Sequence, residues 1–148
     1  MEKVDLSYIR SVAADDDELV GQFIEIFVSQ VPQFSQDIHA AREAENWREL
    51  AAVAHKAKSS IASMGLNELA LNMKRLEMLA KTIYVENTTD DDSMFHSIKA
   101  QIASMPDELS EWISQNKNVN AIDELIKFYN LRVDYAVGEL NNLIDRKI

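Results

Sequence analysis

The sequence predicts an all-α protein, an antiparallel four-helix bundle with a short N-terminal helix and a helical insertion before the last helix. Three observations favour this fold. Apolar residues recur every three or four positions over long stretches, and no segment alternates apolar and polar residues as a half-buried strand does. Glycine and proline, the residues that most often interrupt helices, occur only three times and twice in 148 residues.

Two helices are expected in the N-terminal part. Asp5 is typical of a helix N-cap and predicts a short helix over residues 5–13, and residues 15–17, all aspartate, should open a longer one. Pro32 lies within this second helix, and because the apolar pattern continues in phase we expect a kink there and not an end. The inward residues are Val20, Phe23, Phe27, Val31, Phe34, Ile38 and Ala41.

The two central helices are predicted on either side of a turn. A break near Glu45 and Asn46 leads into a third helix over residues 47–63, and Gly65 is expected to cap its C-terminal end. A fourth helix is predicted over residues 67–84. Its inward residues are Leu69, Met73, Leu76, Ala80 and Ile83.

The C-terminal part is predicted less regularly at first. The polar run 86–92 indicates a turn, residues 93–105 are compatible with a helix, Pro106 is suited to begin another short one, and residues 115–118 form a loop. The last helix, 119–146, shows a sustained apolar stripe. It consists of Ile122, Leu125, Ile126, Tyr129, Val133, Val137, Leu140 and Ile144.

Composition excludes several classes of function. The chain has no cysteine, which rules out disulfides, thiolate nucleophiles and cysteine-based zinc sites and favours a cytoplasmic setting. No apolar run approaches the roughly 20 residues of a membrane span, and the N-terminal MEKVDLSYIR lacks the apolar core of a signal peptide. The net charge of −10, from 15 basic and 25 acidic residues, disfavours nucleic acid and anionic membranes as partners.

The segment AHKAKSSIASMGLNEL in the third helix carries the most informative residues. On a helical wheel the bulky side chains of this helix gather on one side. His55 points toward solvent, more than about 90° away from the centre of that side. Its neighbours are mostly small, although serine is a poor choice for a helix interior. We therefore expect a protein partner to approach closely here. The residues within about 60° of His55 are Ala51, Ala52, Lys58, Ser59 and Ala62.

The motif around His55 resembles the histidine-containing phosphotransfer (HPt) domain family. That family shows roughly A-H-x-L-K-G-S-S, then L-G and later L-E, and this chain has AHKAKSS, Met64-Gly65 and Leu76-Glu77. The resemblance covers about residues 5–84 and the last helix. It implies one domain over residues 1–148, with the motif core at 5–84, an insertion at 86–118 and the final bundle helix at 119–146.

The resemblance implies a role for individual residues. His55 falls on the phosphorylated histidine, Lys58 on the lysine that neutralises the phosphate, Ser59 on the usual glycine and Ser60 on the serine after it. Gly65 falls on the glycine of the turn between the central helices. Two departures are the serine at position 59 and a connection before the last helix that is longer than expected. The implied docking surface consists of the small residues near His55, namely Ala51, Ala52, Ser59, Ser60 and Ala62, with Ile9, Leu19 and Phe23.

In such a phosphorelay, Nε2 of His55 would accept a phosphoryl group from an aspartyl phosphate on a response-regulator receiver domain and pass it to another receiver. The expected partners are receiver domains and a hybrid sensor histidine kinase, and we expect a monomer. The receiver would supply Mg²⁺, so no cofactor or metal of its own is expected. The sequence contains no Gly-rich phosphate loop, Walker motif or kinase signature, which predicts a phosphocarrier without an ATP site and not an enzyme.

Two alternatives belong to other classes of protein. The first is an HPt-like binding module that docks a receiver or histidine kinase without being phosphorylated, and the intact His55 and Lys58 argue against it. The second is a di-metal bundle, which requires Glu-x-x-His pairs. The residues three positions before the three histidines are Gln36, Ala52 and Ser93, and none is a carboxylate.

Overall fold

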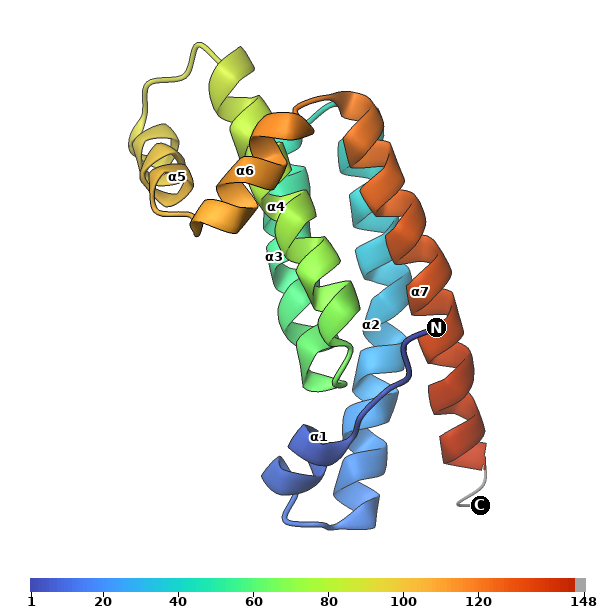
Figure 1. The fold of residues 1–148 in the computed structure, drawn as a ribbon. Helices are drawn as coiled ribbons and strands as arrows, with labels where there is room; N and C mark the ends of the chain where they lie inside the picture. Colours follow the sequence, from blue (N-terminus) through green and yellow to red (C-terminus); the bar gives the residue numbers. More distant parts are fainter. Residues whose placement is uncertain (146–148) are drawn as a thin grey trace.

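The computed structural model describes residues 1–145, in which seven helices and no strand are present. The all-α prediction is confirmed, and the added segment before the last helix is itself helical (Figure 1). The helices are α1 (Ser7–Val12), α2 (Asp17–Glu43), α3 (Trp47–Ser63), α4 (Asn67–Asn87), α5 (Ser93–Ala103), α6 (Asp107–Gln115) and α7 (Val119–Asp145).

The bundle consists of α2, α3, α4 and α7. Helix α3 packs against α2 and α4, and α7 closes the bundle by packing against α2 and α4. In Figure 1, α2 and α7 extend past the turn between α3 and α4, and α1 packs against the protruding end of α2. Helices α5 and α6 form a hairpin on the outer side of α4, at the opposite end of the bundle from α1.

Side-chain caps fix where the long helices begin. The carboxylate of Asp16 accepts hydrogen bonds from the backbone N–H groups of Glu18 and Leu19 at the start of α2. Asp15, which was expected to open this helix, instead lies in the preceding turn with a positive φ of 60°. Asn46 caps α3 in the same way by accepting from the backbone N–H of Glu49 at 3.1 Å.

The N-terminal segment is tied to the turn between α3 and α4, which shortens the predicted first helix. The backbone N–H of Asp5 donates to the carbonyl of Met64 at 2.9 Å, so Asp5 lies outside the helix and Leu6 takes the N-cap position. Gly65 follows the end of α3, as predicted, with a φ of +74°. A Cβ at this position would collide with the backbone of Asp5, which gives a second reason for glycine there.

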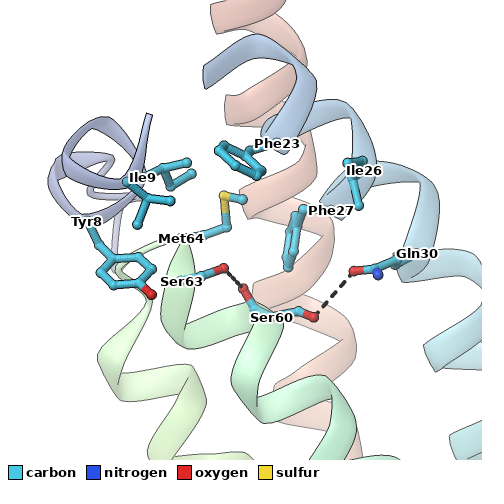
Figure 2. Close-up of a pocket in the computed structure, with 10 residues that line it drawn as sticks. Tyr8, Ile9, Phe23, Ile26, Phe27, Gln30, Ser60, Ser63 and Met64 are labelled. Carbon is cyan, nitrogen blue, oxygen red and sulfur yellow. Dashed lines mark hydrogen bonds between the residues drawn. The ribbon is translucent and has the colours of Figure 1, made fainter. Parts of the chain in front are cut away.

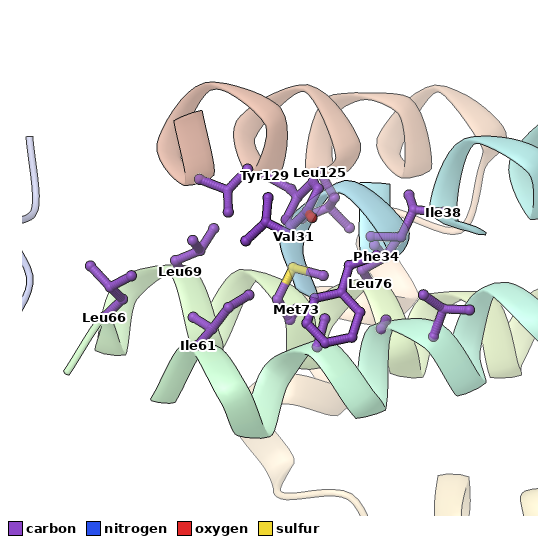
Figure 3. Packing of buried hydrophobic residues seen from close by; sticks show 14 of the residues in the cluster. Val31, Phe34, Ile38, Ile61, Leu66, Leu69, Met73, Leu76, Leu125 and Tyr129 are labelled. Carbon is purple, nitrogen blue, oxygen red and sulfur yellow. The ribbon is translucent and has the colours of Figure 1, made fainter. Parts of the chain in front are cut away.

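One apolar core fills the bundle (Figure 3). The polar groups buried in it are paired. Tyr129 of α7 is buried, and its hydroxyl lies 2.9 Å from Oγ of Ser35. The side-chain amide of Asn72 donates to the carbonyl of Leu125 at 3.0 Å. Within the described residues, no buried side-chain nitrogen or oxygen lacks a hydrogen-bond partner. Phe23, expected in the core, is only half-buried, and Ile24 is buried beside it.

The α5–α6 hairpin is anchored by a few apolar and charged contacts. Ile98 of α5 and Ile113 of α6 are buried. The guanidinium of Arg75 on α4 lies 5.0 Å from the ring centroid of Trp112 on α6, a cation–π contact. The two regions expected to be helical, residues 93–105 and the segment that begins at Pro106, are thus both helical, although α5 ends at Ala103. Among the described residues, no helix is both long and apolar enough to cross a membrane.

Candidate functional site

His55 lies on the exposed side of α3, as predicted, with 63% of its side chain accessible. Three of its small neighbours, Ala52, Ser59 and Ala62, are exposed as well. Ala51 is a correction, because it is only 2% exposed. It lines a hollow together with residues of α4 and α5, and a helical wheel drawn for one helix omits such neighbours.

A buried carboxylate on α4 is hydrogen-bonded to the histidine. Oε2 of Glu77 lies 3.1 Å from Nδ1 of His55, and Glu77 is only 1% exposed. An ionised carboxylate accepts hydrogen bonds and does not donate them, so Nδ1 carries the proton. The lone pair of the neutral ring is then on Nε2, the nitrogen that is available to a partner.

Three lysines surround the same carboxylate. Nζ of Lys81 donates to Oε2 of Glu77 at 2.7 Å, Nζ of Lys58 donates to Oε1 at 3.3 Å, and Nζ of Lys74 lies 3.8 Å from Oε1. Three ammonium groups share one carboxylate, which leaves two positive charges beside His55. In a chain with a net charge of −10, this cluster is a locally positive region, and its charge would favour an anion such as a phosphoryl group.

The lysines also determine the ionisation of Glu77. Burial raises the pKa of this carboxyl, but the hydrogen bond from Lys81 and the charges of Lys81, Lys58 and Lys74 outweigh burial and lower the pKa below its usual value. Burial has the opposite effect on an ammonium group and lowers the pKa of Lys74. Lys58 and Lys81 add to this lowering, and Glu77 opposes it. Glu77 is therefore ionised at neutral pH, as the hydrogen bond to Nδ1 requires.

The site lies within a recognised sequence family. A family model described as the Hpt domain matches residues 22–118, which is more than half of the chain and includes α3, α4 and the α5–α6 hairpin. The chain belongs to the Hpt domain family. Hpt domains are phosphocarriers of two-component signalling that transfer phosphoryl groups through a histidine and interact with receiver domains and kinases. No curated protein and no solved structure gave a significant match.

An apolar groove borders the other end of α3 in this Hpt domain (Figure 2). It has a volume of about 300 Å³ and lies between α1, α2 and the C-terminal part of α3. Of the three docking residues expected from the resemblance, Ile9 and Phe23 line it, whereas Leu19 does not. Phe27, which periodicity had assigned to the core, lines the groove as well, together with Tyr8, Val12, Ile26, Gln30, Ser60, Ser63 and Met64.

The two serines of the motif differ in their surroundings. Ser60 faces the groove, where its hydroxyl donates to Oε1 of Gln30 at 3.3 Å (Figure 2). Ser59 is exposed on the His55 side of α3. Among the described residues, no group of histidine, cysteine, aspartate or glutamate side chains is arranged to hold a metal ion.

Acidification tests the buried ionised state of Glu77. Because its pKa is lowered from an ordinary value of 4.5 in the folded protein, its ionisation stabilises the fold above about pH 4.5. This contribution is lost as the pH falls through the lowered folded-state pKa. We expect the free energy of unfolding at pH 7 to be about 1–3 kcal/mol lower in Glu77→Gln than in the parent. In urea unfolding, the difference should stay constant down to about pH 5 and shrink below pH 4.5, and a difference that grew on acidification would contradict this account.

Proposed function

We propose that Nε2 of His55 accepts a phosphoryl group from the aspartyl phosphate of a receiver domain and passes it to the aspartate of another receiver. The observation that carries this proposal is the 3.1 Å contact between Nδ1 of His55 and the buried carboxylate of Glu77. A proton held on Nδ1 by this contact leaves the nucleophilic lone pair on Nε2, on a side chain that is 63% exposed and therefore within reach of a receiver.

The transfer step balances without a further reactant. The lone pair of Nε2 attacks the phosphorus atom, a P–N bond forms, and the P–O bond to the aspartate breaks to release a carboxylate. The imidazole ring becomes positively charged while Nδ1 keeps its proton, and Glu77 stabilises that charge through the existing hydrogen bond. The receiver contributes the Mg²⁺ that neutralises its own acidic site. Transfer to the second receiver is the reverse of these steps.

The cations of the cluster support the same step electrostatically. Lys58 lies one turn beyond His55 on α3, and Lys81 lies one turn beyond Glu77 on α4. Both contact the carboxylate of Glu77, which is also hydrogen-bonded to the imidazole. Phosphoryl transfer depends on positioning and on neutralising charge at the phosphoryl oxygens. The two positive charges left over after pairing with Glu77 provide that neutralisation when the phosphoryl group arrives.

Incubation with phosphorylated receiver domains tests the proposal. Label from at least one member of a panel of phosphorylated receivers should move to this protein. The product should be acid-labile and base-stable, as a phosphoramidate is. If a phosphorylated receiver binds the protein to saturation and still transfers no label, the result would favour the non-phosphorylated docking module and contradict the proposal.

Bulky side chains near His55 should slow transfer without unfolding the protein. Ala62 and Ser59 are exposed and lie within about 40° of His55 around α3. Ala62→Trp and Ser59→Phe should therefore obstruct the receiver and lower the single-turnover rate strongly, with a stability change below about 0.5 kcal/mol. Ala40→Trp, at an exposed position of α2, is the control. Unchanged transfer in both α3 variants would refute the steric explanation of the small residues.

A further inference from the structure

Two hollows connect His55 with the α5–α6 hairpin. The first, of about 350 Å³, lies between α3 and α5, and Met94 and Ile98 of α5 line it together with His55. The second, of about 250 Å³, lies where α5 turns into α6, and Ser104, Met105 and Pro106 line it together with His55. Lys81 and Gln101 line both hollows. The hairpin therefore borders the imidazole directly, on the side away from the apolar groove.

The hairpin is held in place beside the histidine by a chain of hydrogen bonds. Nζ of Lys81 donates to Oε1 of Gln101 at 2.6 Å and to Oε2 of Glu77 at 2.7 Å, and the same Oε2 contacts Nδ1 of His55. Ile98, buried with 4% exposure, anchors α5 one turn before Gln101. The surface next to His55 is thus a fixed part of the fold at this end of the bundle.

The usual size of a protein interface indicates whether a receiver docked on His55 also contacts the surface of α5. Transient interfaces bury about 600–800 Å² on each partner, which corresponds to a disc with a radius of roughly 14–16 Å. In-line attack requires His55 to lie about 3–3.5 Å from the phosphorus, so His55 is inside that disc. The groove residue Ser60 lies about 7.5 Å along α3 from His55. Because Met94, Ile98 and Gln101 line the same hollow as His55, a footprint of this radius centred on His55 also reaches α5.

The exposed residues of the hairpin suit such a contact. Met94 is 46% exposed and projects a flexible apolar side chain at the edge of the first hollow. Gln101 is exposed, and because its oxygen accepts from Lys81, its amide nitrogen presents two donors to a partner. Apolar and amide groups of this kind can distinguish partners whose catalytic centres are the same.

We propose that the receiver domain docks on both sides of His55, with Met94 and Gln101 of the α5–α6 hairpin as contacts that determine which receivers exchange phosphoryl groups with this protein. This inference rests on the proposed function. Neither residue reacts with the phosphoryl group, and both act by binding the receiver that carries it.

Kinetics of transfer from one phosphorylated receiver test the proposal. Met94→Glu should raise the KM for the receiver roughly tenfold and leave kcat unchanged, because it replaces an apolar contact by a charge that must lose its hydration on docking. Gln101→Ala should raise KM by a smaller factor that differs between receivers. Ala100→Glu adds the same charge at an exposed position about 120° around α5 from Met94, and it is the control, with parent KM.

A binding experiment on the full chain separates the possible outcomes. Titration of the ¹⁵N-labelled protein with an unphosphorylated receiver should shift amide resonances of residues 93–103 as well as those of the groove. Shifts confined to the groove and α3, with parent KM in Met94→Glu, would overturn the hairpin proposal while transfer by the parent protein continued to support the proposed function. A lower kcat for Gln101→Ala at parent KM would overturn its docking role and assign it to positioning Lys81. Absence of transfer in the parent would refute the proposed function instead.

Discussion

His55→Gln should abolish phosphoryl transfer to the protein and leave its helical content unchanged. The side chain is 63% exposed, so the substitution removes the nucleophile and leaves the core intact. The amide of glutamine can still donate to Glu77, which keeps that buried carboxylate paired. Transfer of label from a phosphorylated receiver, together with circular dichroism of parent and variant, measures both expectations.

The other two histidines provide matched controls because their Nε2 atoms are engaged. Nε2 of His96 lies 2.7 Å from a carboxylate oxygen of Asp91, and Nε2 of His39 lies 3.3 Å from the side-chain oxygen of Asn130. In His55 the engaged nitrogen is Nδ1. His39→Gln and His96→Gln should therefore accept label at the parent rate. Persistent labelling of His55→Gln would refute the assignment of His55.

Lys58→Met should slow transfer by roughly 10- to 100-fold, because it keeps the aliphatic part of the side chain and removes the cation. Losing one donor to a developing anion costs about 2.7–4 kcal/mol in enclosed sites. The expected loss of transition-state stabilisation is smaller here, since His55 is exposed and Lys74 and Lys81 remain. Each tenfold loss in rate corresponds to about 1.4 kcal/mol. Lys58→Arg should recover part of the rate by restoring the charge with another shape.

Lys56 is the control for this electrostatic role. It is exposed, and it lies about 100° from His55 around α3, whereas Lys58 points to Glu77. Single-turnover transfer from one receiver should therefore be nearly unchanged in Lys56→Met. Equal rates for Lys58→Met and the parent, or a slower Lys56→Met, would show that Lys58 has no neutralising role.

The features that the sequence predicted correctly depend on local pattern. The four bundle helices follow from apolar spacing along each segment, and the exposure of His55 follows from its position opposite the bulky residues of α3. Helix ends were less accurate. Asp5 and Asp15 are suitable caps by residue type, but contacts with the α3–α4 turn and a turn with positive φ place both of them outside the helices.

The features that were missed depend on contacts between distant segments. Ala51 is buried although it lies near His55 on the helical wheel, and it lines a hollow with Lys81 of α4 and Met94 of α5, which no single-helix pattern reveals. Glu77 entered only as part of a family motif, although the sequence held a sign of its role. Glu77 directly follows the core residue Leu76, and an ionised carboxylate beside the core needs partners. Lys74 and Lys81 lie three and four residues away from it on the same helix. The groove likewise required the packing of three helices.

Direct identification of the phosphorylated atom tests the central claim most sharply. The full chain, labelled with ¹⁵N in its histidine rings, would be phosphorylated by a receiver and observed by ³¹P and ¹⁵N NMR. The account predicts one phosphoramidate, with one-bond coupling between phosphorus and Nε2 of His55, while Nδ1 keeps its proton and its hydrogen bond to Glu77. Coupling to Nδ1 of His55, or to a nitrogen of His39 or His96, would contradict it.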